Sequence, residues 1–452
     1  MPWRSFHKLK GEAEMQNLRQ AAEEVLRRND RGAFTAPSSR QYPHLWLWDA
    51  GFAALGWAAL GDFERAYREI RAALRGQWRN GMLPHVVFYG WPSPYFPGVD
   101  VWRSDLAPEA PTELPTSGIT QPPVLAFVAE ILIRHDPDGG RASAFRREAF
   151  PALYAYHRWL HTARDPEGMG LSVLVHPWES GMDNSPLWDA ALARVSTEGL
   201  PLYHRADIRW VPEEQRPRSV DYDRFLALIL HLRSHRYGES GVQTSPFRVY
   251  DVLFNALRHR SEEALLAMAT ALGEPTGEIE GWLARGRAAS QAHLWDPVCG
   301  FFLDWDAVAK ARIPVIAAGG FLALYAGLAA PEQAREMVAR YLTNPEAFAP
   351  DGGTRYLVPT VSKAEPGWEH RRYWRGPIWV NLNALIAHGL RRYGFAELAE
   401  TIRAHTIALI TRSGFQEYYD PCTGEGLGIG DFTWSSALLL AWDLLETPDR
   451  RN

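Results

Sequence analysis

The stretch of residues 49–74, DAGFAALGWAALGDFERAYREIRAAL, decides the fold class that this chain is expected to adopt. Its two halves, Asp49–Leu60 and Phe63–Leu74, each carry the apolar pattern of a helix. Gly61 separates them, and glycine is the residue that most readily ends a helix in a left-handed conformation. The stretch therefore predicts a helical hairpin.

The same kind of pattern recurs from one end of the chain to the other. Within Asp221–His235, the side chains of Phe225, Leu228, Ile229 and Leu232 stand at the i, i+3, i+4, i+7 positions of one helix face. Further helices are predicted over Met15–Arg28, Val124–Arg134, Phe145–Thr162, Phe247–Leu257, Ser261–Leu272, Glu278–Leu294, Ile316–Leu328, Pro331–Leu342, Ile378–Tyr393, Ala396–Thr411 and Trp434–Leu445.

Strand-like alternation is scarce and is confined to short pieces such as His85–Tyr89 and Phe301–Trp305. Roughly a dozen or more helices, mostly in consecutive pairs, predict an all-α protein. No self-similar sequence period is visible, which disfavours a solenoid of TPR or HEAT repeats. A closed ring of helical hairpins, an (α/α)6 toroid with long loops over one central pocket, fits the number and length of the predicted helices.

No linker or low-complexity tract divides the chain, so residues 1–452 are predicted to form a single domain. The Pro-rich stretch of residues 89–120 is too long and too aromatic for a spacer. Long loops within compact domains are usually functional. We therefore expect residues 89–120 to form a loop excursion over the pocket and to be a candidate lid.

The composition excludes several classes of function. A formal charge of −5, with the arginines spread along the chain, argues against a nucleic-acid partner. No run of about 18 apolar residues predicts a membrane span, and the N-terminal sequence MPWRSFHKLKGEAEM lacks the apolar core of a secretory signal. The two cysteines, Cys299 and Cys422, form neither a disulfide framework nor a CxxC site. A cytoplasmic location is expected, with homo-oligomerisation left open.

The segment His176–Asp189, HPWESGMDNSPLWD, carries the strongest chemical signal. It places the carboxylates Glu179 and Asp183 between two tryptophans and Asp189 directly after the second, and burial against apolar rings raises the pKa of an acid. A raised pKa is what a general acid needs at neutral pH. The alternative is a turn that buries two core tryptophans and caps a helix with Asp183 or Asn184. The segment alone favours neither.

Other polar and aromatic loops lie just before predicted helices. They are YPHLWLWD (residues 42–49), ITQPP (119–123), YWRGPIW (373–379) and a Gly-rich loop that presents Glu417 between Phe415 and Tyr418. Glycoside hydrolysis needs two carboxyl groups of the kind that Asp183 and Glu417 supply. Glu179, Glu365, Glu369 and Asp420 compete for these roles, and nothing in the residues themselves separates Glu179 from Asp183.

Signatures of other enzyme classes are absent from the sequence. Gly426, Gly428 and Gly430 imitate part of a dinucleotide fingerprint, but no strand precedes them and the final spacing is wrong. The chain has no GxSxG elbow, no HExxH zinc site and no Walker loop. No cofactor and no metal is expected.

The order of these segments resembles glycoside hydrolase family 63, and within it the compact bacterial mannosylglycerate and glucosylglycerate hydrolases. The resemblance covers essentially the whole chain, from YPHLWLWDAGF through TQPP, WESGMDNSP and YWRGPIWVNLNAL to FQEYYDPCTGEG. WESGMDNSP is the most specific block, since trehalases carry a similar Glu-Ser-Gly-x-Asp sequence. The larger members of the family have an additional N-terminal β-domain that this chain lacks, which favours the subgroup acting on small substrates.

The resemblance implies an (α/α)6 barrel and an inverting mechanism. It places the general acid at Asp183 and the general base at Glu417. It also implies that a glycerate carboxylate is held by an arginine and tyrosines, here Arg216 or Arg218 with Tyr222 and Tyr373; we favour Arg216 for its spacing to Tyr222. The positions that match those holding the glycone sugar are Tyr42, Trp46, Trp48, Asp49, Gln121, Trp178, Gly181, Trp374 and Trp379.

The expected activity is hydrolysis of a small glycosylglycerate, 2-O-α-mannosylglycerate or 2-O-α-glucosylglycerate; this small-molecule glycoside is the expected partner, without nucleic acid or membrane. One alternative is an oligosaccharide α-glucosidase of the same family. A non-catalytic sugar-binding toroid would keep the tryptophans but should lack a complete acid and base pair. A sugar 2-epimerase on the same toroid would need converging histidines, whereas the loops here carry carboxylates.

Overall fold

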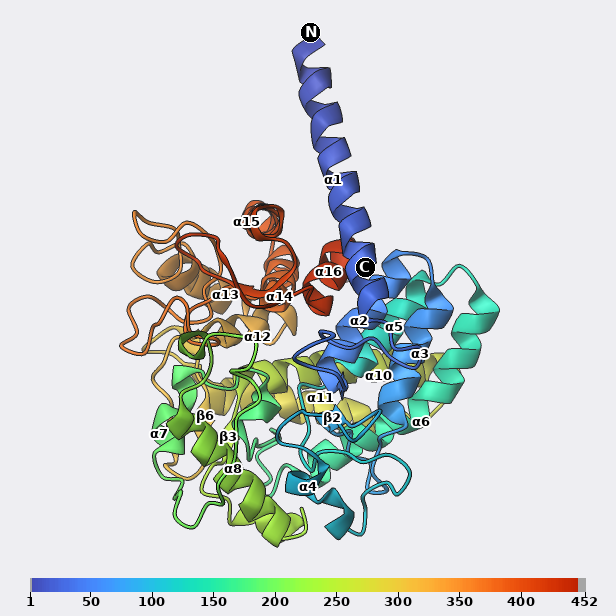
Figure 1. The fold of residues 1–452 in the computed structure, drawn as a ribbon, viewed down its shortest axis with the longest axis vertical. Coiled ribbons are helices and arrows are strands. Elements are labelled where there is room, and N and C mark those ends of the chain that lie inside the picture. The colour runs from blue at the N-terminus through green and yellow to red at the C-terminus, as the bar shows by residue number, and fades with distance from the viewer. Residues whose placement is uncertain (1, 446–452) are drawn as a thin grey trace.

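A computed structural model describes residues 2–445 of the chain, with side chains from residue 13 onward; residues 1 and 446–452 of the predicted single domain lie outside the described residues. Helices dominate, and the strands of the described part are two to five residues long. The first helix, α1 (Pro2–Asn29), packs on the body through its C-terminal part and extends well beyond it (Figure 1).

Six helices contact one another in sequence and close a ring, because the last of them packs against the first. In order around the ring, they are α2 (Leu47–Ala59), α5 (Leu125–His135), α10 (Val252–Leu272), α12 (Leu322–Tyr325), α14 (Val380–Arg392) and α16 (Thr433–Ala441). The closing contact between α2 and α16 is tight, since a Cβ atom on Gly56 would lie 2.7 Å from Cβ of Ala437.

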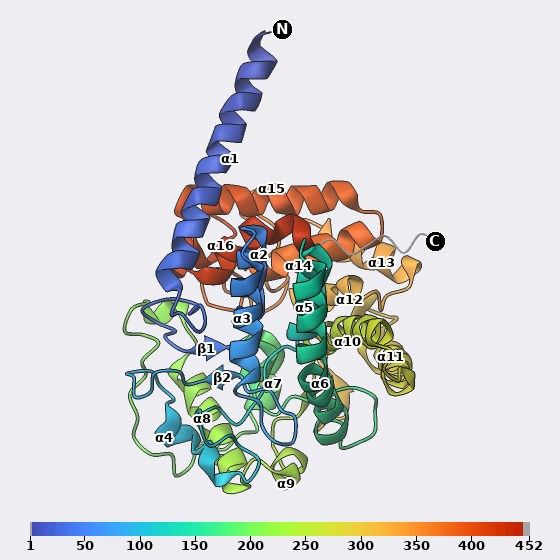
Figure 2. The same ribbon diagram turned by 90° about the vertical axis from the view of Figure 1, so that its right-hand side faces the viewer.

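A second layer of helices covers this ring. The helix α3 (Phe63–Leu74) packs on α2, α6 (Gly139–Ala163) on α5, α11 (Gly277–Ala289) on α10, α15 (Ala396–Ser413) on α14, and α1 on α16. Figure 2 shows α15 lying across α14 and α16, and α11 beside α10. The ring helices are almost wholly buried, with every described residue of α14 from Val380 to Leu390 shielded from solvent.

The remaining elements lie in the loops that join the ring to the outer layer. The short strands pair antiparallel as β1 (Leu45–Trp46) with β2 (Val86–Val87), β4 (Trp295–Asp296) with β5 (Phe301–Phe302), β8 (Gln416–Tyr419) with β9 (Gly426–Gly430), and β3 (Val249–Tyr250) with β6 (Trp305–Asp306) and β7 (Ala311–Arg312). The other α-helices are α4 (Val99–Trp102), α7 (Asp189–Leu192), α8 (Ser219–Ser234), α9 (Glu239–Gln243) and α13 (Pro331–Met337). The 3-10 helices are η1 (Ser104–Leu106), η2 (Pro177–Ser180), η3 (Pro186–Trp188), η4 (Glu213–Gln215), η6 (Ala318–Phe321) and η8 (Trp442–Leu445); η5 (Ser290–Leu294) and η7 (Val338–Leu342) are π-helical turns.

Most predicted helices are present, and two predictions were wrong in part. The predicted helix Phe247–Leu257 begins with the strand β3, and α10 then starts after Asp251, whose carboxylate accepts a hydrogen bond from the Phe254 N–H. From there, α10 continues without a break to Leu272 and absorbs the second predicted helix at Ser261.

The predicted helix Ile316–Leu328 is largely a 3-10 turn, followed by only four residues of α-helix. Gly320 explains part of this difference. A Cβ atom there would lie 2.2 Å from the ring of Phe301, so the backbone needs a residue without a side chain where β5 crosses it. The backbone therefore forms the 3-10 turn η6 at Gly320, although the sequence pattern predicts an α-helix there.

Within residues 89–120, the helices that the structure describes are α4 and η1, and the rest of this stretch is loop. The loop packs on α8, where Arg233 donates a hydrogen bond of 2.9 Å to the Val101 carbonyl, and on the turn after α8, where the Tyr237 hydroxyl donates to the Trp102 carbonyl. None of the described helices combines the length and apolar character needed to cross a lipid bilayer.

Candidate active site

One cavity opens inside the loops at the start of the ring helices. All of the site residues predicted from the sequence line it. They are Tyr42, Trp46, Trp48, Asp49, Gln121, Trp178, Gly181, Asp183, Arg216, Tyr222, Tyr373, Trp374, Trp379 and Glu417. Residues far apart in the sequence therefore meet around one space.

The starts of three ring helices bring aromatic rings to the cavity. Trp46 precedes α2, Trp379 precedes α14 and Phe432 precedes α16. The indoles of Trp374 and Trp379 stack with centroids 3.7 Å apart and planes 6° apart. Stacked rings hold one another rigidly and present flat apolar faces, which suits the binding of a sugar ring.

Asp183 opens onto the cavity from the turn between η2 and η3. Burial raises the pKa of its carboxyl to about 7, the negative charge of Glu417 acts in the same direction, and the positive charge of Arg216 opposes both. Gly181 makes room for the turn. It has a φ of +74°, and a Cβ atom there would lie 2.6 Å from the indole of Trp48. At neutral pH, a large fraction of Asp183 therefore keeps its proton.

Glu417 lies on β8 and is buried. Its carboxylate accepts hydrogen bonds from the Tyr42 hydroxyl at 2.7 Å, from Nη1 of Arg216 at 3.1 and 3.3 Å, and from the Ile429 N–H at 3.1 Å. Gly428 allows this approach, because its φ is +70° and a Cβ atom would lie 2.5 Å from Oε2 of Glu417. The hairpin of β8 and β9 thus presents Glu417 to the cavity as an acceptor.

Glu179 has a different environment from Asp183. Its carboxylate is fully buried and bonds Arg164 at 2.6 and 2.9 Å, and it also accepts the N–H groups of Thr120 and Val175. It is not among the residues that line the cavity. The structure therefore separates the two acids that the sequence pattern left equal, and Glu179 is a structural anchor beneath the η2 turn.

Replacing Glu179 with glutamine is expected to lower the free energy of unfolding by about 3 kcal/mol, because the Arg164 charge would stay buried without its partner. Denaturant unfolding followed by circular dichroism measures this change. The matched control is Glu332→Gln, which removes the exposed ion pair with Arg335 and should change the stability by less than about 0.5 kcal/mol. Equal stability of the two variants would contradict a structural role for Glu179.

The capping alternative for the His176–Asp189 segment was wrong in its residues. Ser185, rather than Asp183 or Asn184, caps the following turn by accepting the Leu187 N–H. The Asn184 side chain instead accepts the Trp374 N–H at 3.0 Å and so ties this segment to the YWRGPIW loop. The burial of Trp188 that this alternative also expected is present.

The other competing acids are engaged outside the cavity. Asp189 pairs with Arg375, Glu365 accepts the Ile316 N–H, and Glu369 pairs with Arg218, Arg372 and Arg375. Asp49, in the first turn of α2, also lines the cavity. Burial and the charges of Glu417 and Asp183 raise the pKa of Asp49 well above its usual range.

Arg216 and Arg218 also differ clearly. Arg216 is buried in the cavity, with its guanidinium 4.1 Å above the ring of Tyr373 and its Nη2 atom 2.7 Å from the Tyr42 hydroxyl. The side chain of Arg218 is half-exposed and pairs with Glu369. Of the two arginines considered from the sequence, Arg216 is therefore the one that can contact a ligand in the cavity.

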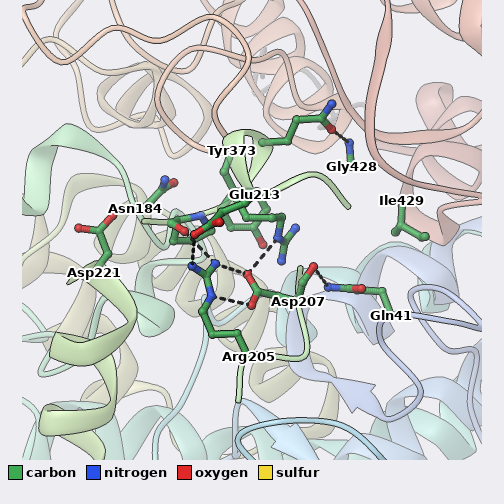
Figure 3. A network of polar contacts seen from close by, with 12 residues as sticks. Gln41, Asn184, Arg205, Asp207, Glu213, Asp221, Tyr373, Gly428 and Ile429 are labelled. Carbon is green, nitrogen blue, oxygen red and sulfur yellow. Dashed lines mark hydrogen bonds and ion pairs between the residues drawn. The ribbon is translucent and has the colours of Figure 1, made fainter. Parts of the chain in front are cut away.

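Sequence reasoning missed Asp207, a buried residue that lines the cavity. Figure 3 shows its carboxylate facing Arg205, which bonds it at 2.6 and 3.0 Å, while its carbonyl accepts from Gln41. Asp207 lies in the stretch RADIRW, which has no pattern that marks a site. The other cavity residues missed are Pro37, Gln41, His85, Tyr95, Phe96, Ala206, Phe432 and Trp434; Tyr95 and Phe96 belong to the predicted lid.

In the described part of the chain, only His370, Asp420 and Cys422 bring three potential metal-ligating groups together. They lie outside the cavity lining. Asp420 already accepts hydrogen bonds from Nδ1 of His370 at 2.9 Å and from Arg371 at 3.0 Å, so its charge is balanced by protein donors.

The cavity itself contains acids and an arginine in an arrangement that suits acid and base chemistry.

Comparison with known proteins agrees with this geometry. The sequence model of the mannosylglycerate hydrolase MGH1-like glycoside hydrolase domain matches residues 42–435. The mannosylglycerate hydrolase of Thermus thermophilus is 49% identical over 93% of this chain and 99% of the relative. The glucosylglycerate hydrolase of Mycolicibacterium hassiacum is 36% identical over 92% of this chain and 96% of the relative.

The same similarity holds in three dimensions. The crystal structure of the family 63 mannosylglycerate hydrolase from Thermus thermophilus in complex with Tris and D-glycerate superposes with a TM-score of 0.89 at 47% identity, over 94% of this chain and 100% of that chain. A neutral trehalase from Saccharomyces cerevisiae shares the fold at a TM-score of 0.58 and 19% identity, over 92% of this chain and 74% of that chain. The chain therefore belongs to the mannosylglycerate hydrolase MGH1-like glycoside hydrolases of family 63.

Proposed function

We propose that this protein is an inverting α-glycosidase that hydrolyses a small glycosylglycerate, 2-O-α-mannosylglycerate or 2-O-α-glucosylglycerate, to the free sugar and glycerate. The observation that carries the proposal is the pair of carboxyl groups, Asp183 and Glu417, on one tryptophan-walled cavity. Relatives named mannosylglycerate hydrolase and glucosylglycerate hydrolase, aligned over more than nine-tenths of the chain, support the substrate class. Its fold is a single catalytic domain built as an (α/α)6 toroid, which the closed ring of six helices supports.

The mechanism follows from the two environments. Asp183, which holds its proton up to a pH of about 7, donates it to the glycosidic oxygen as the bond from that oxygen to the anomeric carbon breaks. Glu417 takes a proton from a water molecule, whose oxygen bonds to the anomeric carbon on the opposite face of the sugar. Inversion requires the carboxyls to stand roughly 6.5–9.5 Å apart, so that the water fits between them.

The glycone is held by the residues around these acids. The indoles provide flat apolar faces for the sugar ring, and Tyr42, Asp49 and Gln121 provide hydrogen-bonding groups for its hydroxyls. Tyr95 and Phe96 reach the cavity from the loop of residues 89–120, which acts as a lid that excludes bulk water and selects short aglycones. No metal or cofactor takes part in this mechanism.

The aglycone carboxylate is bound by Arg216, with Tyr222 and Tyr373 beside it. Arg216 lines the cavity, and its guanidinium lies 4.1 Å above the ring of Tyr373. A planar guanidinium suits a carboxylate that enters this space. The crystal structure of the Thermus thermophilus relative contains D-glycerate, which supports a carboxylate-bearing aglycone for the family.

A substrate panel tests the proposal. The protein is expected to release glycerate from mannosylglycerate, from glucosylglycerate or from both, and to turn over trehalose and kojibiose far more slowly. Proton NMR of the first product formed should show the β-anomer, since inversion of an α-glycoside produces it. Turnover of the disaccharides in preference to both glycosylglycerates would contradict the substrate class, and a first-formed α-anomer would contradict inversion.

The dependence of kcat/KM on pH should follow the protonation of Asp183. The reaction needs the protonated acid, and the pKa of Asp183 in the free enzyme is about 7, so kcat/KM should fall tenfold for each pH unit above this value. Initial rates at low substrate concentration across pH 5–9 measure this limb. An α-glycosyl fluoride needs no proton on its leaving group and should not show it; a fall of equal size with both substrates would contradict the assignment.

A further inference from the structure

Arg216 contacts both the general base and the region in which we place the aglycone carboxylate. Its Nη1 atom lies 3.1 and 3.3 Å from the two oxygens of Glu417. Its Nη2 atom donates to Tyr42, whose hydroxyl in turn donates to Glu417 at 2.7 Å. One guanidinium therefore contacts the general base and also lines the cavity that a ligand would enter.

The neighbouring charges leave the positive charge of Arg216 mainly to Glu417. Asp207 is 3.5 Å from Nε of Arg216, but its carboxylate is already paired with Arg205 at 2.6 Å (Figure 3). Burial raises the pKa values of Asp49 and Asp183, which favours their neutral forms. Before substrate binds, the positive charge of Arg216 is therefore balanced mainly by the carboxylate of Glu417.

We propose that the carboxylate of the aglycone activates the general base through Arg216, so that the anion contributes to the rate of water attack as well as to binding. This inference rests on the proposed function. A guanidinium bound to Glu417 stabilises the ionised form and so weakens its pull on the proton of water. A second carboxylate on the same guanidinium brings negative charge close to Glu417 and so makes Glu417 a stronger base toward the proton of water.

The same added charge favours the protonated form of Asp183, because a nearby negative charge makes ionisation of a carboxyl less favourable. An anionic aglycone therefore shifts both carboxyls toward the forms that the reaction uses. A neutral aglycone of the same shape would occupy the cavity without this effect. Selectivity would then reside in the transition state, and it would be visible in kcat as well as in KM.

Two measurements on the wild-type protein test the coupling. The first compares a glycosylglycerate with the corresponding glycosylglycerol, in which a CH₂OH group replaces the carboxylate; kcat is expected to fall about tenfold or more on this change. The second uses an α-glycosyl fluoride, which leaves the aglycone region empty and needs no proton from Asp183. Sodium acetate or formate should accelerate its hydrolysis about tenfold and saturably, relative to sodium chloride at equal ionic strength.

Two variants locate the effect. Arg216→Gln should abolish the acceleration by acetate, whereas Arg218→Gln should retain it, because Arg218 pairs with Glu369 outside the cavity. Circular dichroism and thermal unfolding establish that both variants are folded. Should Arg216→Gln fail to fold, the wild-type response to acetate still decides the question, since it requires no substitution.

The outcomes separate this inference from the function on which it rests. Carboxylates that only inhibit hydrolysis of the fluoride, together with a neutral analogue that differs in KM alone, would limit Arg216 to binding and overturn the coupling. Acceleration that persists in Arg216→Gln would also overturn it. Failure of the proposed function would give a different result: the protein would hydrolyse the fluoride or a disaccharide but would hydrolyse no glycosylglycerate.

Discussion

Asp183→Asn is expected to lower kcat for a glycosylglycerate by about 10³-fold, because an amide of the same shape cannot donate a proton to the departing glycerate oxygen. The loss should depend on the leaving group. Fluoride departs without protonation, so the variant should keep most of the wild-type rate on an α-glycosyl fluoride. Steady-state kinetics with the two substrates measure both effects, and the contrast between them identifies a general acid.

The matched control for this substitution is Asp189→Asn, six residues along the same segment (189 − 183). The Asp189 side chain is half-exposed and pairs with Arg375 outside the cavity, so this variant should stay within about threefold of the wild-type rate. Near wild-type hydrolysis of a glycosylglycerate by Asp183→Asn would remove Asp183 from the mechanism.

Glu417→Gln is expected to lower kcat by about 10³-fold or more on both kinds of substrate. The attacking water must lose a proton whatever group departs, and an amide cannot accept it. Glutamine can still accept the hydrogen bond of the Tyr42 hydroxyl, so the loss should arise from the missing base rather than from a displaced side chain. Equal losses with the fluoride and the glycosylglycerate therefore distinguish Glu417 from Asp183.

Glu425→Gln provides the control for Glu417, since Glu425 lies in the turn of the same hairpin with an exposed carboxylate that pairs with Arg371. It should retain the wild-type rate. Thermal unfolding of Glu417→Gln should be measured beside it, because Arg216 loses a charged partner in this variant. Retained hydrolysis of the fluoride by a folded Glu417→Gln would refute the role of general base.

Helix boundaries were predictable where local side chains set them. The helix α3 spans the predicted Phe63–Leu74, because the Asp62 side chain caps its start by accepting the Arg65 N–H. The helix α10 was not predicted as one element. Its start is set by Asp251, and residues 252–262 are all buried, which erases the one-sided apolar pattern that marks a surface helix.

Site residues were predictable when they belonged to dense polar and aromatic motifs. The cavity gathers YPHLWLWD, WESGMDNSP, YWRGPIW and FQEYYD, which are separated by long stretches of chain. Asp207 could not be found in this way, since its role arises from contacts with Arg205 and Gln41 that only the folded chain creates. The choice between Glu179 and Asp183 likewise needed the buried partner Arg164.

The starts of α2, α14 and α16 around the cavity have an electrostatic consequence for substrate capture. The backbone dipoles of a helix add to roughly half a positive charge at its start. With Trp46, Trp379 and Phe432 at these starts, three such partial charges face one space in a protein whose net charge is −5. Close to the first turn of each helix, these partial charges favour the carboxylate of an anionic glycoside, and added salt should weaken its binding more than that of an uncharged sugar.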